Sequence, residues 1–284
     1  MDQRPVIVSW GEVLWDRFPH GDELGGAPAN VAFHLAERGA NAWLVSRVGD
    51  DDDGRRAVSA LASAGVHVEG VQLDPDLRTG EVGVDIDDDG NARYTLYNGR
   101  AWERIECGED ELRLLATADV FCFGTLAQRT AEGYAAHRSA LEALPAKAIV
   151  VCDPNLRTGF GNWDLMIESL GSAGAVKINE AEARAVERHV RCDDAADHLH
   201  SELGVELVAL TCGERGCLLT TASGHRAEHA GFQAEPGGDN VGCGDAFTAT
   251  LCLGLANGWS LERIAETANR AASIVAGHPG ATRR

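Results

Sequence analysis

Lysine is almost absent from this sequence, since only Lys147 and Lys177 occur among 284 residues. Lysine and arginine together number 25 against 44 aspartates and glutamates, which gives a formal net charge of −19. A chain this acidic, with its arginines scattered, repels a nucleic-acid backbone and offers no polybasic segment to a membrane surface. We therefore expect neither nucleic acid nor a membrane as a partner.

Long apolar runs and paired cysteine motifs are also lacking. No run approaches the length of a membrane span, and the first thirty residues do not read as a secretion signal. The eight cysteines form no CxxC pair and lie mostly in apolar runs. We expect a cytoplasmic protein with reduced core thiols, and neither a disulfide framework nor a zinc site.

The pattern that is present alternates buried strands with amphipathic helices. Continuous apolar runs of the kind found in parallel sheets occur at residues 5–11, 42–49, 118–124, 148–153, 175–179 and 205–210. Helical spacing lies between them, at residues 28–38, 54–64, 130–144, 180–188, 246–256 and 261–275. Such alternation predicts an α/β fold with right-handed crossovers.

One region breaks this alternation. Residues 79–97 alternate apolar and polar side chains around Asp89-Gly90, which is typical of a β-hairpin on a half-exposed sheet. We expect this hairpin to pair with residues 10–18 in a small sheet that could cover a pocket.

The strongest motif is DNVGCGDAF at residues 239–247, directly before an apolar-periodic helix. Gly242 and Gly244 would allow backbone N–H groups to point at an anion, and the helix N-terminus adds positive dipole character. Asp245 could then accept a proton from a hydroxyl that attacks the bound phosphate. By itself the pattern equally predicts a helix cap. The chain lacks GxxxxGK[ST], and no GxGxxG follows the first strand, so a P-loop or dinucleotide site is not expected.

Polar groups suited to ligands occur in two further segments. GGAPANVA at residues 25–32 combines two glycines with Asn30 in the first turn of a helix, and Asp16 in GEVLWD could reach the same pocket. DPNLR at residues 153–157 follows a buried strand, and Arg157 can bind phosphate oxygens bidentately.

Two later segments are ambiguous. Asn179 and Glu182 lie one turn apart and could face a nucleotide, although acidic residues in a first turn ordinarily serve the helix itself. TCGERG at residues 211–216 suits either a turn beside phosphates or a plain hairpin turn.

The segment DNVGCGD resembles the DxxGAGD signature of the ribokinase-like (PfkB) carbohydrate kinases, with Cys243 in place of the usual alanine. GEVLWD followed by GGAPANVA resembles the fructokinase-like branch, and the DxNxR, NxxE and TxGxxG patterns follow in family order. The matches extend from Gly11 to Ala281. The resemblance implies an ATP-dependent sugar kinase with a three-layer α/β/α fold and a mostly parallel central sheet. It also implies a single domain over residues 1–284, with a β-sheet lid from roughly 10–24 and 75–102.

The resemblance assigns roles residue by residue. The implied catalytic residues are Asp245 as the base, Gly242, Cys243 and Gly244 as anion-hole amides, and Arg157 near the transferred phosphate. The implied sugar contacts are Asp16, Gly26, Asn30 and Asp245. The implied nucleotide contacts are Asn179, Glu182, Thr211, Gly213, Gly216, Gly244 and Asn269. Mg²⁺ would be held through water by Glu182, and potassium is left open at Asp239 and the carbonyl of Val241.

The acceptor stays open at this point. The GGAPANVA form differs from the GGKGxN form of several sister groups and favours a neutral sugar, with fructose as the first to test. A 2-keto-3-deoxygluconate kinase would use a pair such as Arg93 and Tyr94. A nucleoside kinase would need an aromatic clamp, for which the available side chains are Trp10, Trp15, Phe18 and Trp102. A noncatalytic binding protein on the same fold is a further alternative. The resemblance also implies a homodimer through the lid.

Overall fold

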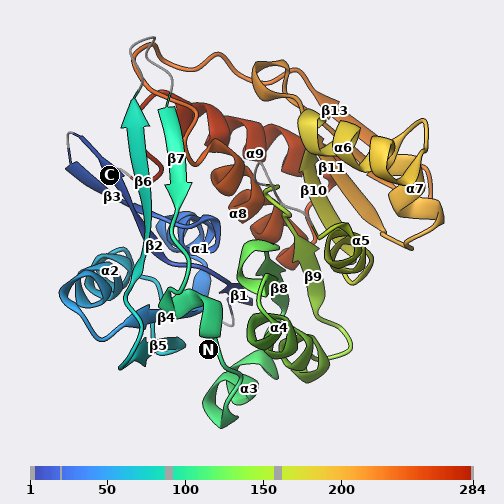
Figure 1. The fold of residues 1–284 in the computed structure, drawn as a ribbon. Helices are drawn as coiled ribbons and strands as arrows, with labels where there is room; N and C mark the ends of the chain where they lie inside the picture. The colour runs from blue at the N-terminus through green and yellow to red at the C-terminus, as the bar shows by residue number, and fades with distance from the viewer. Residues whose placement is uncertain (1–3, 20, 87–91, 157–161, 283–284) are drawn as a thin grey trace.

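The computed structural model describes residues 4–19, 21–86, 92–156 and 162–282. Its main element is a nine-stranded sheet with the order β13-β12-β11-β10-β9-β8-β1-β4-β5 (Figure 1). The strands are β1 (Val6–Trp10), β4 (Asn41–Gly49), β5 (Val71–Asp74), β8 (Val120–Phe123), β9 (Ile149–Cys152), β10 (Ala175–Asn179), β11 (Leu207–Thr211), β12 (Cys217–Thr221) and β13 (Arg226–His229). All pairings from β5 to β11 are parallel, and only β12 and β13 are antiparallel. Each of the six predicted apolar runs forms one of the parallel strands.

Helices cover both faces of this sheet (Figure 1). They are α1 (Ala27–Glu37), α2 (Asp52–Ser63), α3 (Glu109–Leu115), α4 (Ala131–Ala143), α5 (Trp163–Gly171), α6 (Glu180–Val190), α7 (Ala195–Ser201), α8 (Cys243–Ala256) and α9 (Leu261–Ala276). Neighbouring residues of β1 face opposite sides of the sheet. Ile7 belongs to a buried cluster that includes residues of α1, α8 and α9, whereas Val8 belongs to a cluster that includes residues of α4, α5, α6 and α7. The predicted three-layer α/β/α class is confirmed.

A second, four-stranded sheet stands beside the large one, in the order β3-β2-β6-β7. It contains β2 (Leu14–Phe18), β3 (Gly21–Gly25), β6 (Gly80–Ile86) and β7 (Ala92–Leu96). β6 and β7 form the predicted antiparallel hairpin, and β2 pairs with β6 in parallel. The turn at Asp89-Gly90 lies outside the described residues. We call these four strands the small sheet.

The small sheet is tied to the main body through Trp15. Its ring is buried, its Nε1 donates to the carbonyl of Asp53 at 3.1 Å, and the Arg56 guanidinium lies 3.8 Å from the ring centroid. Arg17 adds ion pairs to Asp53 and Glu81. β2 is therefore fixed against α2 as well as against its neighbouring strands.

The eight cysteines all lie in the described part of the chain, and none of them forms a disulfide there. Among the helices that the structure describes, none is both long and apolar enough to cross a membrane.

Candidate active site

Asp245 and Asn30 meet at the carboxyl-terminal edge of the parallel sheet. Asn30 Nδ2 donates to Asp245 Oδ2 at 2.7 Å, although 215 positions separate the two residues. Both are nearly buried, at 5% exposure for Asn30 and 8% for Asp245. The contact exists because the first turns of α1 and α8 lie side by side, so the predicted sugar segment and the predicted anion loop form one site.

The geometry at the start of α8 separates Asp245 from an ordinary helix cap. The cap position belongs to Gly242, and Asp245 is the third residue of the helix. The first bond of the helical ladder runs from Ala246 N to the carbonyl of Gly242. The amides of residues 243–245 consequently lie outside that ladder and point along the helix axis, where they can bind an anion.

Gly242 is required by both conformation and space. Its φ of +79° lies in the left-handed region, and an added Cβ would lie 2.5 Å from Ala281 Cβ. Cys243 beside it is half-buried, and burial raises the pKa of its thiol to about 11. A thiol that stays protonated near neutral pH reacts slowly with alkylating agents.

Asp239 joins the anion loop to the C-terminal segment. Its Oδ1 accepts from Val241 N at 2.9 Å and its Oδ2 accepts from Gly280 N at 3.1 Å, while Asp239 N donates to the carbonyl of His278. The residues proposed for potassium are therefore brought together with the C-terminal segment. Both carboxylate oxygens of Asp239 already accept backbone N–H groups.

The glycine pair before α1 is enclosed by the small sheet. A Cβ on Gly25 would collide with the Asp16 carboxylate, and one on Gly26 would collide with the carbonyl of Glu12. Gly26 has φ +100° and is the cap residue of α1. The structure thus places Asp16 directly over the turn that leads to Asn30.

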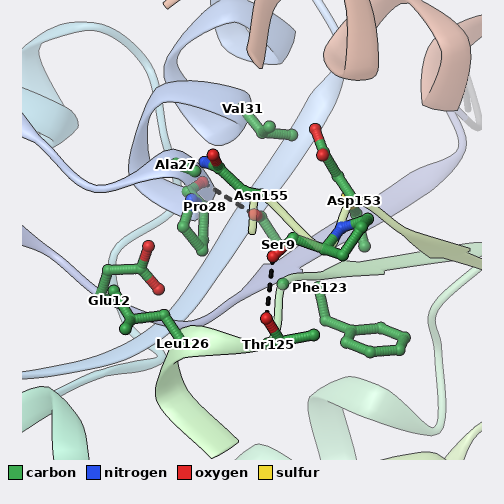
Figure 2. A pocket seen from close by; sticks show the side chains of 13 residues that line it. Ser9, Glu12, Ala27, Pro28, Val31, Phe123, Thr125, Leu126, Asp153 and Asn155 are labelled. Carbon is green, nitrogen blue, oxygen red and sulfur yellow. Dashed lines mark hydrogen bonds between the residues drawn. The ribbon is translucent and has the colours of Figure 1, made fainter. Parts of the chain in front are cut away.

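A narrow cavity lies between the ends of β1, β8 and β9 and the start of α1 (Figure 2). Its polar lining includes Ser9, Glu12, Thr125, Asp153 and Asn155. Ser9 donates to the carbonyl of Pro28 and Thr125 donates to that of Pro154, so these hydroxyls fix the walls. Asn155 has φ +44°, an uncommon value for a residue other than glycine, and such strain is often found at functional sites.

Asn179 and Glu182 form a capping box at the start of α6. Asn179 Oδ1 accepts from Ala181 N and Glu182 N, and Glu182 Oε2 accepts from Asn179 N at 2.8 Å. Glu182 Oε1 also accepts from Leu156 N at 2.8 Å, which ties the loop after β9 to α6. Glu182 is 5% exposed, and burial raises its pKa.

The remaining predicted nucleotide contacts lie around the β11–β12 hairpin. Thr211 ends β11, and Gly216 lies so close to the carbonyl of His229 that only glycine can occupy it. Gly213, with φ +59°, faces open space. Asn269 Nδ2 is turned into the core and donates to Cys217 Sγ at 3.0 Å and to the carbonyl of Ala265 at 2.7 Å.

Arg157 lies outside the described residues, as do the side chains of Arg93 and Tyr94. The aromatic residues considered for a nucleoside clamp are mostly in the core. Trp10 and Trp102 are fully buried among Phe121 and Phe123, and Trp15 packs under Arg56. The clamp expected for a nucleoside acceptor is therefore not formed by these three tryptophans.

Three polar residues of the site were not assigned roles by the sequence. Lys177 and Asp153 form a buried ion pair at 3.1 Å, and Glu12 is 4% exposed at the cavity wall. A signal existed for Lys177, because a charged residue in the middle of the apolar run AVKIN is unusual in a parallel strand. For Glu12 and Asp153 the signal was only their position at strand ends.

A doubly covered parallel sheet with an anion loop and a buried carboxylate at its carboxyl edge defines a ribokinase-like small-molecule kinase. The family model described as "pfkB family carbohydrate kinase" matches residues 21–284. The chain belongs to the pfkB family of carbohydrate kinases. This confirms the predicted family and the predicted enzyme class, an ATP-dependent carbohydrate kinase.

Individual relatives agree with this assignment. Fructokinase-2 of Solanum lycopersicum is 31% identical over 267 residues, which cover 87% of this chain and 80% of the relative. The crystal structure of a fructokinase from Vibrio cholerae O395 with fructose, ADP and calcium superposes with a TM-score of 0.83 at 21% identity, covering 99% of this chain and 96% of that one. A proposed ribokinase II from E. coli, in complex with ATP and Mg²⁺, has a TM-score of 0.86 at 20% identity and covers 98% and 94% of the two chains.

Proposed function

We propose that this kinase transfers the γ-phosphoryl group of ATP to a hydroxymethyl group of a small neutral sugar, with fructose as the preferred acceptor. The observation that carries the proposal is the 2.7 Å hydrogen bond between Asn30 and Asp245, which joins a sugar-type segment to an anion loop. The fructokinase relatives and the fructose held by the Vibrio structure support the choice of acceptor.

Asp245 acts as the general base in this proposal. A sugar hydroxyl placed between the carboxylate and the start of α8 gives its proton to Asp245 as its oxygen attacks the γ-phosphorus, and the bond to the β-phosphate oxygen breaks. The amides of residues 243–245 stabilise the negative charge on the transferring phosphoryl oxygens. Arg157 would add a bidentate cation from the loop after β9.

The sugar binds in the cavity of Figure 2. Asp16 lies over the Gly25-Gly26 turn, and this turn leads into Ala27 and Pro28 at the cavity wall. The carboxylate of Asp16 and the amide of Asn30 suit vicinal hydroxyls.

Magnesium would be held mainly by the phosphate oxygens of ATP and by water. Among the residues that the structure describes, no cluster of three or more acidic, histidine or cysteine side chains could hold a metal. Glu182 is the carboxylate proposed to contact the ion through water, even though its oxygens also accept amides. Mg²⁺ that arrives with a nucleotide needs few protein carboxylates, so the residues suit this mode of binding.

We infer that the small sheet is a lid over the sugar, within a single domain that comprises the whole chain. Gly280 lies against the Glu23 side chain of β3, so the small sheet reaches the segment that supports the anion loop. Dimerisation through this sheet and a potassium site at Asp239 and Val241 belong to the same proposal.

The test compares Asp245→Asn with a matched control. Asp197 is also the third residue of a helix, α7, but is exposed. We expect Asp245→Asn to lower kcat by about 10²- to 10⁴-fold, because the base is lost, with KM values within severalfold of the parent. Asp197→Asn should match the parent. The measurement is coupled ADP release with fructose, ribose, glucose, 2-keto-3-deoxygluconate and adenosine.

If the kcat of Asp245→Asn is within severalfold of the parent value, Asp245 is not the general base. If the parent phosphorylates none of the five acceptors with Mg²⁺ and K⁺ present, the noncatalytic alternative replaces the proposed function. Preference for another acceptor over fructose would correct the substrate alone.

A further inference from the structure

Lys177 is a buried ammonium at the centre of the site. It is the third residue of β10 and is 5% exposed, whereas the only other lysine, Lys147, is exposed. A lysine side chain is almost never buried unless it is paired, because removing its charge from water costs several kcal/mol. The residues around Lys177 must therefore supply negative charge to compensate the ammonium.

The Lys177 ammonium is held by the carboxylate of Asp153, the residue directly after β9. Its Nζ lies 3.2 Å from Asp153 Oδ1 and 3.1 Å from Asp153 Oδ2. The Thr248 hydroxyl of α8 lies 2.6 Å from Asp153 Oδ2 and 3.0 Å from the carbonyl oxygen of Gly244, and its one hydrogen is shared between these two acceptors. A continuous network thus runs from β10 through β9 to the first turn of α8.

The same ammonium touches the anion loop itself. A Cβ built on Gly244 would lie 3.0 Å from Lys177 Nζ, so the side chain passes directly beneath this residue. Burial tends to lower the pKa of Lys177, but the charges of Asp153, Glu182 and Asp245 together raise it. Lys177 is therefore a permanent cation among three carboxylates, immediately behind the amides assigned to the anion hole.

We propose that Lys177 is a positioning residue for phosphoryl transfer, which holds the Gly244 turn and Asp245 in their reactive arrangement and supplies positive charge behind the anion hole. This inference rests on the proposed function. Negative charge that gathers on the transferring phosphoryl group lies on the far side of the loop, where a fixed cation in a water-poor site has its largest effect.

A purely structural ion pair would behave differently. Replacing both partners of a buried pair by neutral groups is often neutral or stabilising for the fold. Chemistry that depends on the Lys177 charge would still be lost after such a replacement. Stability and turnover therefore distinguish the two roles.

The experiment compares Lys177→Met with Lys147→Met as the matched control. We expect Lys177→Met to lower kcat by about 100-fold, a loss typical of an electrostatic contributor, with KM for fructose within about threefold. The acid limb of its kcat/KM profile should move up by about one pH unit, because losing the cation raises the pKa of the adjacent base. Lys147→Met should match the parent in both.

A second measurement does not need turnover. Fluoroaluminate with MgADP mimics a transferring phosphoryl group, and its tightening of ADP binding is measured by calorimetry. Lys177→Met should lose most of this tightening while it binds MgADP alone as the parent does. If the parent has no sugar kinase activity, the proposed function fails. The fluoroaluminate measurement still shows whether Lys177 stabilises a bound mimic of the phosphoryl group.

The double variant Lys177→Met with Asp153→Asn is used if the single variant does not fold. A folded double variant with the kcat of the parent would overturn the proposal. So would a folded Lys177→Met that equals Lys147→Met in kcat, pH profile and fluoroaluminate binding. A folded double variant that keeps ADP binding but loses the fluoroaluminate effect supports it.

Discussion

Asn30 illustrates at the scale of one residue how two distant motifs share a function. Its Nδ2 donates to Asp245, while its Oδ1 is buried and accepts no hydrogen bond from the residues that the structure describes. A buried amide oxygen without a donor is costly, and a sugar hydroxyl would supply that donor. Asn30 would therefore orient both the base and the acceptor.

Asn30→Asp tests this shared position. The new carboxylate would lie within hydrogen-bond distance of Asp245, and two carboxylates this close cannot both ionise readily. We expect the acid limb of kcat/KM for fructose to move up by at least about one pH unit, since one proton is retained by the pair. Initial rates between pH 5 and 9 check it.

The control for this change is Asn257→Asp, because Asn257 is exposed at the other end of α8. It should keep the pH profile of the parent. An Asn30→Asp enzyme whose profile is also unchanged would contradict a direct contact between residue 30 and the base.

At the scale of the element, α8 carries left-handed glycines at both ends. Gly242 (φ +79°) precedes the helix against Ala281, and Gly258 (φ +62°) follows it with no atom within 4 Å of an added Cβ. Both changes to alanine force a side chain into the left-handed region, at about 1–2 kcal/mol each. Only the change at Gly242 also displaces the anion loop.

We therefore expect Gly242→Ala to lower kcat by about 100-fold, the loss that a misplacement of about 1 Å can cause. Gly258→Ala should lose about 1–2 kcal/mol of stability and keep the kcat of the parent. Thermal unfolding and ADP release measured on both variants check this. Equal kcat values in the two variants would show that the loop geometry at Gly242 does not matter for transfer.

The sequence predicted those elements whose pattern is set locally. The apolar runs found six of the seven parallel strands that the structure describes and missed β5, and helical spacing found α1, α2, α4, α6, α8 and α9 within a few residues. The short helices α3, α5 and α7 were missed, because seven to nine residues give little periodicity. Contacts between distant residues, such as the ion pair of Lys177 with Asp153, depend on the order of the strands in the sheet. Local sequence patterns do not predict this order.

The sequence predicted which residues belong to the candidate site better than it predicted their hydrogen-bond partners. Asp245 and Asn30 carried recognisable patterns, and the fold brings them together. Glu182 was expected to face a nucleotide. Its two carboxylate oxygens accept hydrogen bonds from the backbone amides of Asn179 and Leu156. A capping box and a metal contact use the same residue types at the same spacing, so sequence could not separate them.

At the scale of the whole molecule, burial of neutral histidine couples stability to pH. His137 of α4 is 2% exposed between Trp10 and Phe123, with ring centroids 5.1 and 4.2 Å away. Burial lowers its pKa from 6.5 to about 3, and burial likewise lowers that of His34 to about 4. Both side chains are thus neutral in the folded state at pH values where the unfolded chain would bind their protons.

The sign of the effect follows from this difference. Above pH 6.5 neither state is protonated at these sites, and their full contribution to stability is present. As pH falls from 6.5 towards 4, the unfolded state gains protons that the folded state cannot bind, so stability is lost. Each such histidine costs up to about 1.4 kcal/mol per pH unit in this window.

His137→Phe should flatten this loss, because phenylalanine suits the same aromatic surroundings and cannot titrate. We expect the free energy of unfolding to fall by about 2 kcal/mol less than in the parent between pH 6.5 and 4.5. Urea unfolding at a series of pH values measures this, with His225→Gln as the control because His225 is exposed. A His137→Phe protein whose stability declines with pH as steeply as that of the control would show that His137 is protonated in the folded state.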